Sequence, residues 1–239
     1  MQDRVRLLGI AVNTASTNAA SDAAIGYLEE ESCRFVYLVN SETLIILQNN
    51  SEEENVLEDC DMILPGTLSV NSSVDEVLGY KRDPFFLESY FDRIFDYAVE
   101  NGCEIQLIAG SEEQYTSVQD SIHEKWSYLT LSGTYLTEKD SSYEHIVNEI
   151  NSIAPDILIL ALNENMQLKL LENYRNQMNA GMILFTGNTL YNKAVSEAKV
   201  PESIEKLKIE NIYKWFHKDK SGKSLFNNIK MKLRIKRDK

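Results

Sequence analysis

The segment that decides the fold spans residues 85–108 and reads FFLESYFDRIFDYAVENGCEIQLI. Its first part predicts an amphipathic helix over Phe85–Glu100, because apolar residues recur there every three or four positions. These residues are Leu87, Tyr90, Ile94, Tyr97 and Ala98. Asn101-Gly102 is typical of a helix end, and the apolar run Glu104–Ile108 that follows predicts a strand. A helix, a glycine turn and a buried strand in succession form one unit of an α/β fold.

The same alternation continues along the chain. Further strands are predicted at Val5–Val12, Arg34–Leu38, Met62–Leu64, Leu129–Leu131, Ile157–Leu162 and Met182–Thr186. Further helices are predicted at Asn18–Glu30, Glu42–Gln48, Glu112–Lys125, Tyr143–Ile153 and Gln167–Met178. Residues 66–84 are rich in turn-forming residues and predict a loop. The pattern predicts a mostly parallel sheet of Rossmann-like βαβ units with helices on both faces.

Charge divides the chain into two expected domains, an α/β body over residues 1–200 and a basic appendage over residues 201–239. The net charge is −13, and residues 201–239 hold twelve Lys and Arg against five Asp and Glu, which is +7 and leaves −20 for the body. No apolar run approaches the ~18 residues of a membrane-spanning helix, and no signal-peptide pattern is present, so we expect a cytoplasmic protein. The three cysteines are Cys33, Cys60 and Cys103, and their spacing favours buried thiols over disulfides or a zinc site.

The appendage predicts two amphipathic helices, about Ser203–His217 and Ser224–Lys236. Basic helices that carry aromatic residues are typical of proteins that lie on an anionic membrane surface. The residues expected to contact the membrane are Lys214, Trp215, Phe216, Lys230, Lys232 and Arg234. The alternative is a solvated tail that pairs with the acidic body. Nucleic acid is not expected as a partner, because the charge of the body repels phosphates.

In open α/β sheets, ligands bind beyond the carboxyl ends of the strands. Three predicted turns lie at such ends, around Gly110, Asn163 and Gly187, and each leads into a helix whose first amides could receive phosphate oxygens. The alternative is that the two glycines only make tight turns. Both interpretations stay open at the level of the sequence.

Several segments carry a resemblance through their order and spacing. They are Leu8–Asn13, Val36–Glu42, Asp61–Val70, Arg82, Leu107–Gly110, Gly133–Tyr135, Ile157–Gln167 and Ile183–Pro201. In this order they resemble the WecG/TagA/CpsF family of bacterial glycosyltransferases, over about residues 5–239. The resemblance implies a metal-independent, inverting transfer of a hexosamine, typically N-acetylmannosamine. The donor would be a UDP-sugar and the acceptor a polyprenyl-diphosphate-linked sugar at the inner face of the cell membrane, with no cofactor.

The resemblance also implies roles for individual residues. Asn40, Arg82 and Gln167 match family positions expected to bind donor and acceptor, and Gly110 and Gly187 would let the backbone approach the diphosphate. Glu42 matches the glutamate of the segment that contains Asn40. Within the turn that contains Gln167, four residues depart from the family pattern: Asn163, Asn165, Met166 and Leu168.

Two departures affect the chemistry, because Gly66 and Tyr191 stand where the family carries aspartates. An inverting transfer needs a base beside the acceptor hydroxyl, and a carboxylate is the usual group. Glu42 and Glu164 are the remaining candidates, and we expect that aspartates at positions 66 and 191 together would raise transfer. Asp59-Cys60-Asp61 has the spacing of a metal-binding D-x-D motif but precedes its strand, so no metal site is predicted.

Two functions are therefore consistent with the sequence. One is a glycosyltransferase of cell-surface polysaccharide or teichoic-acid-type assembly, with an altered catalytic arrangement. The other is a catalytically inactive family member that binds or regulates an active transferase, since a fold does not guarantee a chemistry. Another transferase subunit or a second copy of the chain is a further partner that the resemblance admits.

Overall fold

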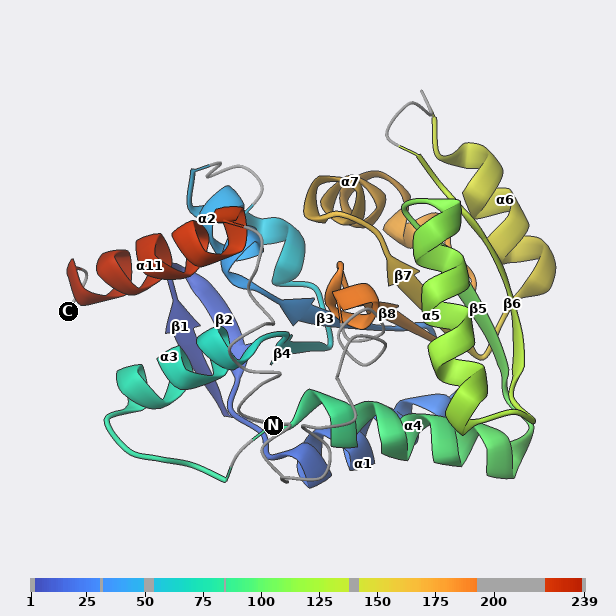
Figure 1. Ribbon diagram of the computed structural model, residues 1–239, viewed down its shortest axis with the longest axis horizontal. Coiled ribbons are helices and arrows are strands. Elements are labelled where there is room, and N and C mark those ends of the chain that lie inside the picture. Colours follow the sequence, from blue (N-terminus) through green and yellow to red (C-terminus); the bar gives the residue numbers. More distant parts are fainter. Residues whose placement is uncertain are drawn as a thin grey trace, which may run out of the picture.

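The protein is described from a computed structural model, which places residues 3–30, 32–49, 54–83, 85–137, 142–192 and 222–237. Six parallel strands form its central sheet, in the order β4-β3-β8-β7-β5-β6 (Figure 1). The strands are β3 (Arg34–Val39), β4 (Met62–Pro65), β5 (Glu104–Ala109), β6 (Thr130–Tyr135), β7 (Ile157–Ala161) and β8 (Met182–Phe185). An all-parallel sheet confirms the α/β prediction.

Helices cover both faces of this sheet. One face packs against α2 (Ser41–Asn49), α6 (Glu144–Ile153) and α7 (Glu164–Tyr174), and the other against α1 (Thr17–Leu28), α4 (Leu87–Asn101) and α5 (Glu112–Lys125). Strand side chains alternate between the two cores, so that Tyr37 lies in the first and its neighbour Val36 in the second. Figure 1 shows α1 and α4 side by side on their face. Short 3-10 helices lie at Glu54–Leu57 and Arg175–Gln177.

The predicted strand Val5–Val12 is in fact a hairpin, so that prediction was wrong in its bounds. Strands β1 (Arg4–Leu7) and β2 (Ile10–Asn13) pair antiparallel and are joined by Leu8 and Gly9, whose φ values are 51° and 93°. A two-residue hairpin turn requires such positive φ values. The hairpin packs beside β4, where the Ile63 amide donates a hydrogen bond of 2.7 Å to Asn13 Oδ1.

The predicted loop over residues 66–84 contains a helix, α3 (Leu68–Leu78). Thr67 caps its first turn by accepting a hydrogen bond from the Val70 amide, and Gly79 ends it with a φ of 75°. Val70 and Val74 are buried at a spacing of four residues. Of the Ser and Asn residues that suggested a loop, Ser72 is exposed, Ser69 and Asn71 are half-buried and Ser73 is fully buried. The short apolar repeat was therefore the better signal.

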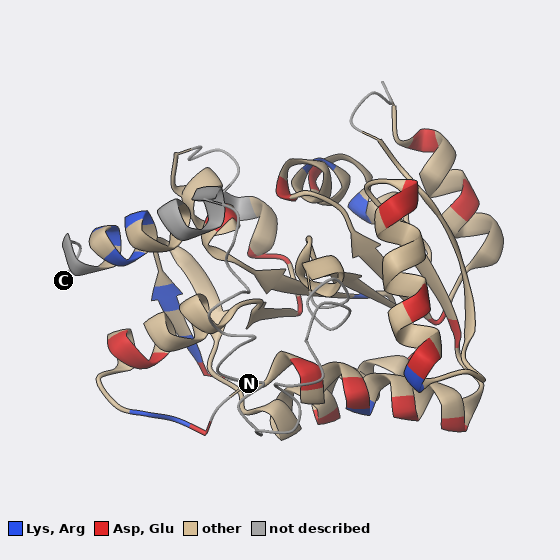
Figure 2. Cartoon of the chain, viewed as in Figure 1, with Lys and Arg blue, Asp and Glu red and all other residues tan. Residues whose placement is uncertain are grey.

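The second predicted helix of the appendage is present as α11 (Gly222–Arg237), which packs against α2. Its buried side includes Met231 and Ile235, which join the core, and Arg234 hydrogen-bonds Gln48 and Asn49 at the end of α2. Figure 2 shows the basic residues of α11 and the acidic residues along α4, α5 and α6. The first predicted tail helix, with Lys214, Trp215 and Phe216, lies outside the described residues. Among the helices that the structure describes, none is long and apolar enough to cross a bilayer.

Candidate functional site

Four predicted residues meet at the carboxyl edge of the sheet: Asn40 after β3, Glu164 and Gln167 at the start of α7, and Gly187 after β8. Asn40 Nδ2 donates a hydrogen bond of 2.5 Å to Glu164 Oε1. The Gly187 amide donates one of 3.0 Å to Gln167 Oε1. We call these four residues the edge cluster. It joins segments far apart in the sequence at the place where open α/β sheets bind ligands.

Helix caps hold the edge cluster in position. Asn40 Oδ1 accepts a hydrogen bond of 2.9 Å from the Thr43 amide and so caps α2, while Asn163 Oδ1 accepts one of 3.0 Å from the Met166 amide and caps α7. Glu164 is the first residue of α7 and only 5% exposed. A carboxylate at this place interacts favourably with the positive end of the helix dipole. The caps therefore fix the direction in which Glu164 and Asn40 project.

Gly187 is required by its surroundings. Its φ is 58°, in the left-handed region that favours glycine. A Cβ atom added there would lie 3.3 Å from Glu164 Oε1 and 3.4 Å from Gln167 Nε2. The groups that lie close to Gly187 are side chains of the edge cluster, and the approach of its backbone to a diphosphate stays a prediction.

Gly110 lies on another part of the same edge, at the start of α5. Its amide donates a hydrogen bond of 3.0 Å to Gln114 Oε1, and Gln114 Nε2 donates one of 3.3 Å to Asn188 Oδ1. Gln114 thus ties α5 to the segment after β8. Sequence reasoning missed Gln114, and a glutamine three residues after the helix cap Ser111 was the available signal.

Arg82 is tied to α3 instead. Arg82 Nε lies 3.1 Å from Asp75 Oδ1, one terminal nitrogen donates to the Ala15 carbonyl at 3.3 Å, and the other donates to Asn71 Oδ1. Its side chain is 6% exposed, and burial lowers the pKa of the guanidinium while Asp75 opposes that shift. The contacts described for Arg82 connect the loop before α4 with α3 and the loop before α1, and none of them reaches the edge cluster.

The other carboxylate candidate, Glu42, lies in the first turn of α2, half-buried, two residues after Asn40. Tyr191, at the position where the resemblance implies a second aspartate, donates a hydrogen bond of 3.2 Å to Glu113 at the start of α5. Partial burial, and then this carboxylate, raise the pKa of Tyr191. Its phenol is therefore held as a neutral donor beside α5.

Gly66 closes the end of β4 against β3. Its amide donates a hydrogen bond of 2.7 Å to the Val39 carbonyl. A Cβ atom at this position would lie 2.9 Å from the Leu38 carbonyl oxygen and 3.1 Å from that of Val39. Both atoms belong to the backbone, so an aspartate here requires the ends of β3 and β4 to move apart. The expected gain from an aspartate at position 66 conflicts with this packing.

The D-x-D segment lies at the amino ends of the strands, and both of its aspartates pair with arginines. Asp61 pairs with Arg34 at 2.8 Å and accepts a hydrogen bond from the Phe35 amide, and Asp59 pairs with Arg175 at 2.6 Å. These contacts hold the starts of β3 and β4. Within the described ranges, no group of three or more His, Cys, Asp or Glu residues could hold a metal ion.

Comparison with known families identifies the chain. The model described as "Glycosyl transferase WecG/TagA/CpsF family" matches residues 5–238, nearly the whole sequence. Among curated proteins, no significant match is found. The family match agrees with the resemblance in the order of the segments.

Proposed function

Because the chain belongs to the WecG/TagA/CpsF family of glycosyltransferases, we propose that it transfers a hexosamine of the N-acetylmannosamine type. The donor is a UDP-sugar and the acceptor a polyprenyl-diphosphate-linked sugar. The observation that carries this proposal is the edge cluster, in which a buried carboxylate, two amides and a glycine converge at the carboxyl ends of β3, β7 and β8. Convergent polar groups at this edge are the usual setting of a sugar-nucleotide site.

Glu164 is the base in this proposal. In an inverting transfer, the acceptor hydroxyl loses its proton to the base as its oxygen bonds to the anomeric carbon, and the UDP oxygen leaves with the electron pair of the broken bond. The Asn40 amide donates to Oε1 of Glu164 and so fixes the orientation of the carboxylate that takes the proton. A positioned base contributes about 10²–10⁴-fold to the rate.

Transfer to a short polyprenyl-diphosphate-linked acceptor tests the assignment, with Glu164→Gln compared with Glu42→Gln. We expect Glu164→Gln to lower kcat about 10²–10⁴-fold while UDP-sugar binding, measured by calorimetry, stays within a few-fold. Glu42→Gln should retain transfer. The opposite ranking would make Glu42 the base, and equal activity of all three proteins would remove both glutamates from the mechanism.

A binding-only family member is the second candidate, and the packing of Gly66 favours it. The backbone of β3 leaves no room for a side chain where relatives carry an aspartate. This candidate predicts that UDP-sugar binds without turnover, or that nothing binds, even with saturating acceptor. Measured transfer that Glu164→Gln abolishes would exclude it.

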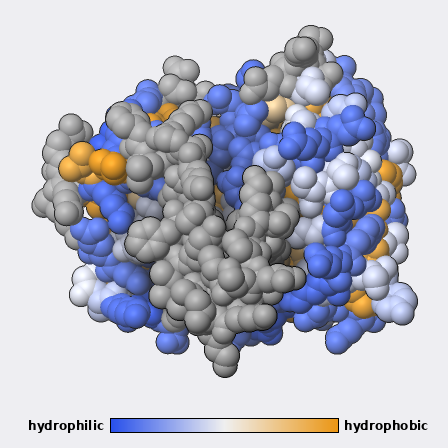
Figure 3. All heavy atoms as spheres, viewed as in Figure 1, coloured by the Kyte–Doolittle hydropathy of each residue, from blue (hydrophilic) through white to orange (hydrophobic). Residues whose placement is uncertain are grey.

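We further propose that α11 helps to hold the protein on the inner face of an anionic membrane. Its outer side exposes Ile229 by 52% and Leu233 by 65%, next to the exposed Lys232. Figure 3 shows apolar atoms at the surface in the region of α11. Exposed apolar side chains beside basic residues are suited to the boundary between lipid headgroups and acyl chains.

Co-sedimentation with vesicles that contain phosphatidylglycerol tests this surface. Leu233→Glu should weaken binding several-fold without lowering the melting temperature, because the side chain is exposed and the new charge would enter lipid. Tyr128→Glu is the matched control, since Tyr128 is 90% exposed on the acidic body. Equal loss of binding in both variants would contradict the assignment to α11.

A further inference from the structure

A tyrosine lies directly beneath the edge cluster. Tyr37 on β3 pairs in register with Phe185 on β8, and their rings stack at 5.4 Å with an interplanar angle of 16°. Tyr37 is three residues before Asn40, and Phe185 is two residues before Gly187. This pair of rings therefore forms the layer of the core immediately below the proposed site.

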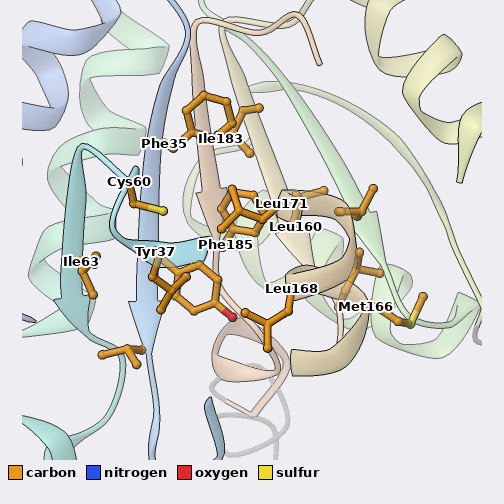
Figure 4. Packing of buried hydrophobic residues seen from close by; sticks show 14 of the residues in the cluster. Phe35, Tyr37, Cys60, Ile63, Leu160, Met166, Leu168, Leu171, Ile183 and Phe185 are labelled. Atoms are coloured by element: carbon orange, nitrogen blue, oxygen red, sulfur yellow. The ribbon is translucent and has the colours of Figure 1, made fainter. Parts of the chain in front are cut away.

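The Tyr37 hydroxyl is directed at the helix that carries Glu164. Figure 4 shows the oxygen pointing toward α7, beside Leu168. Glu164 is four residues before Leu168, so the two side chains lie on one face of α7 and Glu164 is one turn nearer the carboxyl edge. The Thr43 hydroxyl lies close enough to the phenol to interact with it as a hydrogen-bonding group, and the Cys60 thiol is the other polar group nearby.

This hydroxyl forms no hydrogen bond of good geometry with any described residue, although Tyr37 is 0% exposed. A buried polar group without a partner costs about 1–3 kcal/mol, and phenylalanine would fill the same space without that cost. Apolar packing alone therefore does not account for a tyrosine at this position. A hydrogen bond from this hydroxyl toward the Glu164 carboxylate would explain why a tyrosine is present.

We propose that Tyr37 is a positioning residue for Glu164. Its hydroxyl donates, through one intervening water molecule, a hydrogen bond that keeps the Glu164 carboxylate ionised and directed toward the acceptor. The role in catalysis rests on the proposed function, in which Glu164 is the base. Contacts longer than about 3.5 Å between polar groups are commonly bridged by water in enzyme sites.

The charge state of the phenol fits this role. Burial, and then the negative charge of Glu164, raise the pKa of Tyr37 above its usual value, so it keeps its proton at neutral pH. The other titratable group that faces it, Cys60, has its pKa raised to about 12, mainly by burial, and is also neutral. Glu164 is then the only charged group among those described around the Tyr37 hydroxyl, and the phenol acts as a donor.

Tyr90 provides a matched control. It is also 0% exposed, its hydroxyl has no hydrogen bond to a described residue, and burial raises its pKa as well. It lies on α4 in the core on the other face of the sheet, between Phe85 and Phe91. Tyr90→Phe removes the same atom from the same kind of environment, away from Glu164.

The test is a carbon-13 NMR titration of the glutamate side-chain carboxyls in the whole chain, with Glu164→Gln used to assign the Glu164 signal. Loss of a hydrogen bond to the ionised form raises the pKa of a carboxyl, so Tyr37→Phe should raise the pKa of Glu164 by about one unit. Tyr90→Phe should leave it unchanged. An unchanged pKa of Glu164 in Tyr37→Phe would overturn the proposal.

A second measurement needs no change at Tyr37. In the wild-type protein, the carbon-13 signal of the Tyr37 ring carbon that bears the hydroxyl should move as Glu164 titrates, and this movement should be absent in Glu164→Gln. A Tyr37 signal that ignores Glu164 would also overturn the proposal. Both readouts are independent of transferase activity.

Activity then separates this inference from the proposed function. With transfer present, Tyr37→Phe should lower kcat about tenfold or more, leave KM for the donor unchanged and shift the lower limb of the pH–rate profile to higher pH. NMR shifts as expected without wild-type transfer would refute the proposed function and leave the contact between Tyr37 and Glu164 standing. Transfer with no NMR shift would refute the positioning role alone.

Discussion

Replacement of Gly66 by alanine isolates the close contact at the end of β4. The new methyl group would lie 2.9 Å from the Leu38 carbonyl oxygen, 3.0 Å from its carbonyl carbon and 3.1 Å from the Val39 carbonyl oxygen. All three are backbone atoms, and the hydrogen bond from the Gly66 amide to Val39 holds the two strand ends together. We expect Gly66→Ala to destabilise the protein by about 1–3 kcal/mol, as overpacking does. Gly66→Asp should cost more, because it also buries a charge.

The assay is thermal unfolding, followed by circular dichroism or calorimetry. For a chain of this size, a loss of that magnitude lowers the melting temperature by roughly 2–12 °C. Gly26→Ala is the matched control, because Gly26 lies within α1 and a Cβ atom there would meet nothing within 4 Å. That variant should be stabilised by about 0.5–1 kcal/mol. If Gly66→Ala melts at or above the wild-type temperature, the packing argument against an aspartate at position 66 is refuted.

Two further predictions concern the backbone and the thiols. Ala154 ends α6 in the left-handed region, with a φ of 50° and a ψ of 59°. Because glycine adopts this conformation without strain, Ala154→Gly should raise the free energy of unfolding, measured in urea, by about 0.5–1 kcal/mol. A loss of stability would contradict the left-handed assignment. The pKa of Cys60 is raised to about 12, mainly by burial. A thiol reagent at pH 8 should therefore leave Cys60 unmodified in the folded protein and modify the half-buried Cys33 and Cys103 first. Peptide mapping of the modified protein measures this order.

The order and type of the elements followed from the sequence where apolar periodicity was strong. The helix with Tyr90 and Ile94 and the strand after Gly102 were predicted within two residues of their observed bounds. Periodicity could not reveal the turn at Leu8 and Gly9, because both hairpin strands are apolar and only the backbone angles separate them. Helix α3 was hidden by serine and asparagine, which are common in loops. The helix accommodates Ser72 and Ser73 because their hydroxyls donate hydrogen bonds to the carbonyls of Leu68 and Ser69, one turn earlier.

The candidate site was predictable in its parts but not in its contacts. Asn40, Glu164, Gln167 and Gly187 were all selected from the sequence, and the parallel sheet brings them together because their strands end at one edge. The hydrogen bonds of Arg82 depend on the position of α3, which was not predicted. The orientation of Tyr37 depends on strand register between β3 and β8, which no local pattern specifies.

The packing of α11 on α2 also constrains the order of events during synthesis. The apolar side of α2 forms close to the start of the chain, while the methionine and isoleucine that cover it, Met231 and Ile235, leave the ribosome almost two hundred residues later. Until then, the apolar side of α2 is exposed to solvent in a nascent chain whose sheet has otherwise assembled. Such transiently exposed apolar surface favours aggregation until α11 docks.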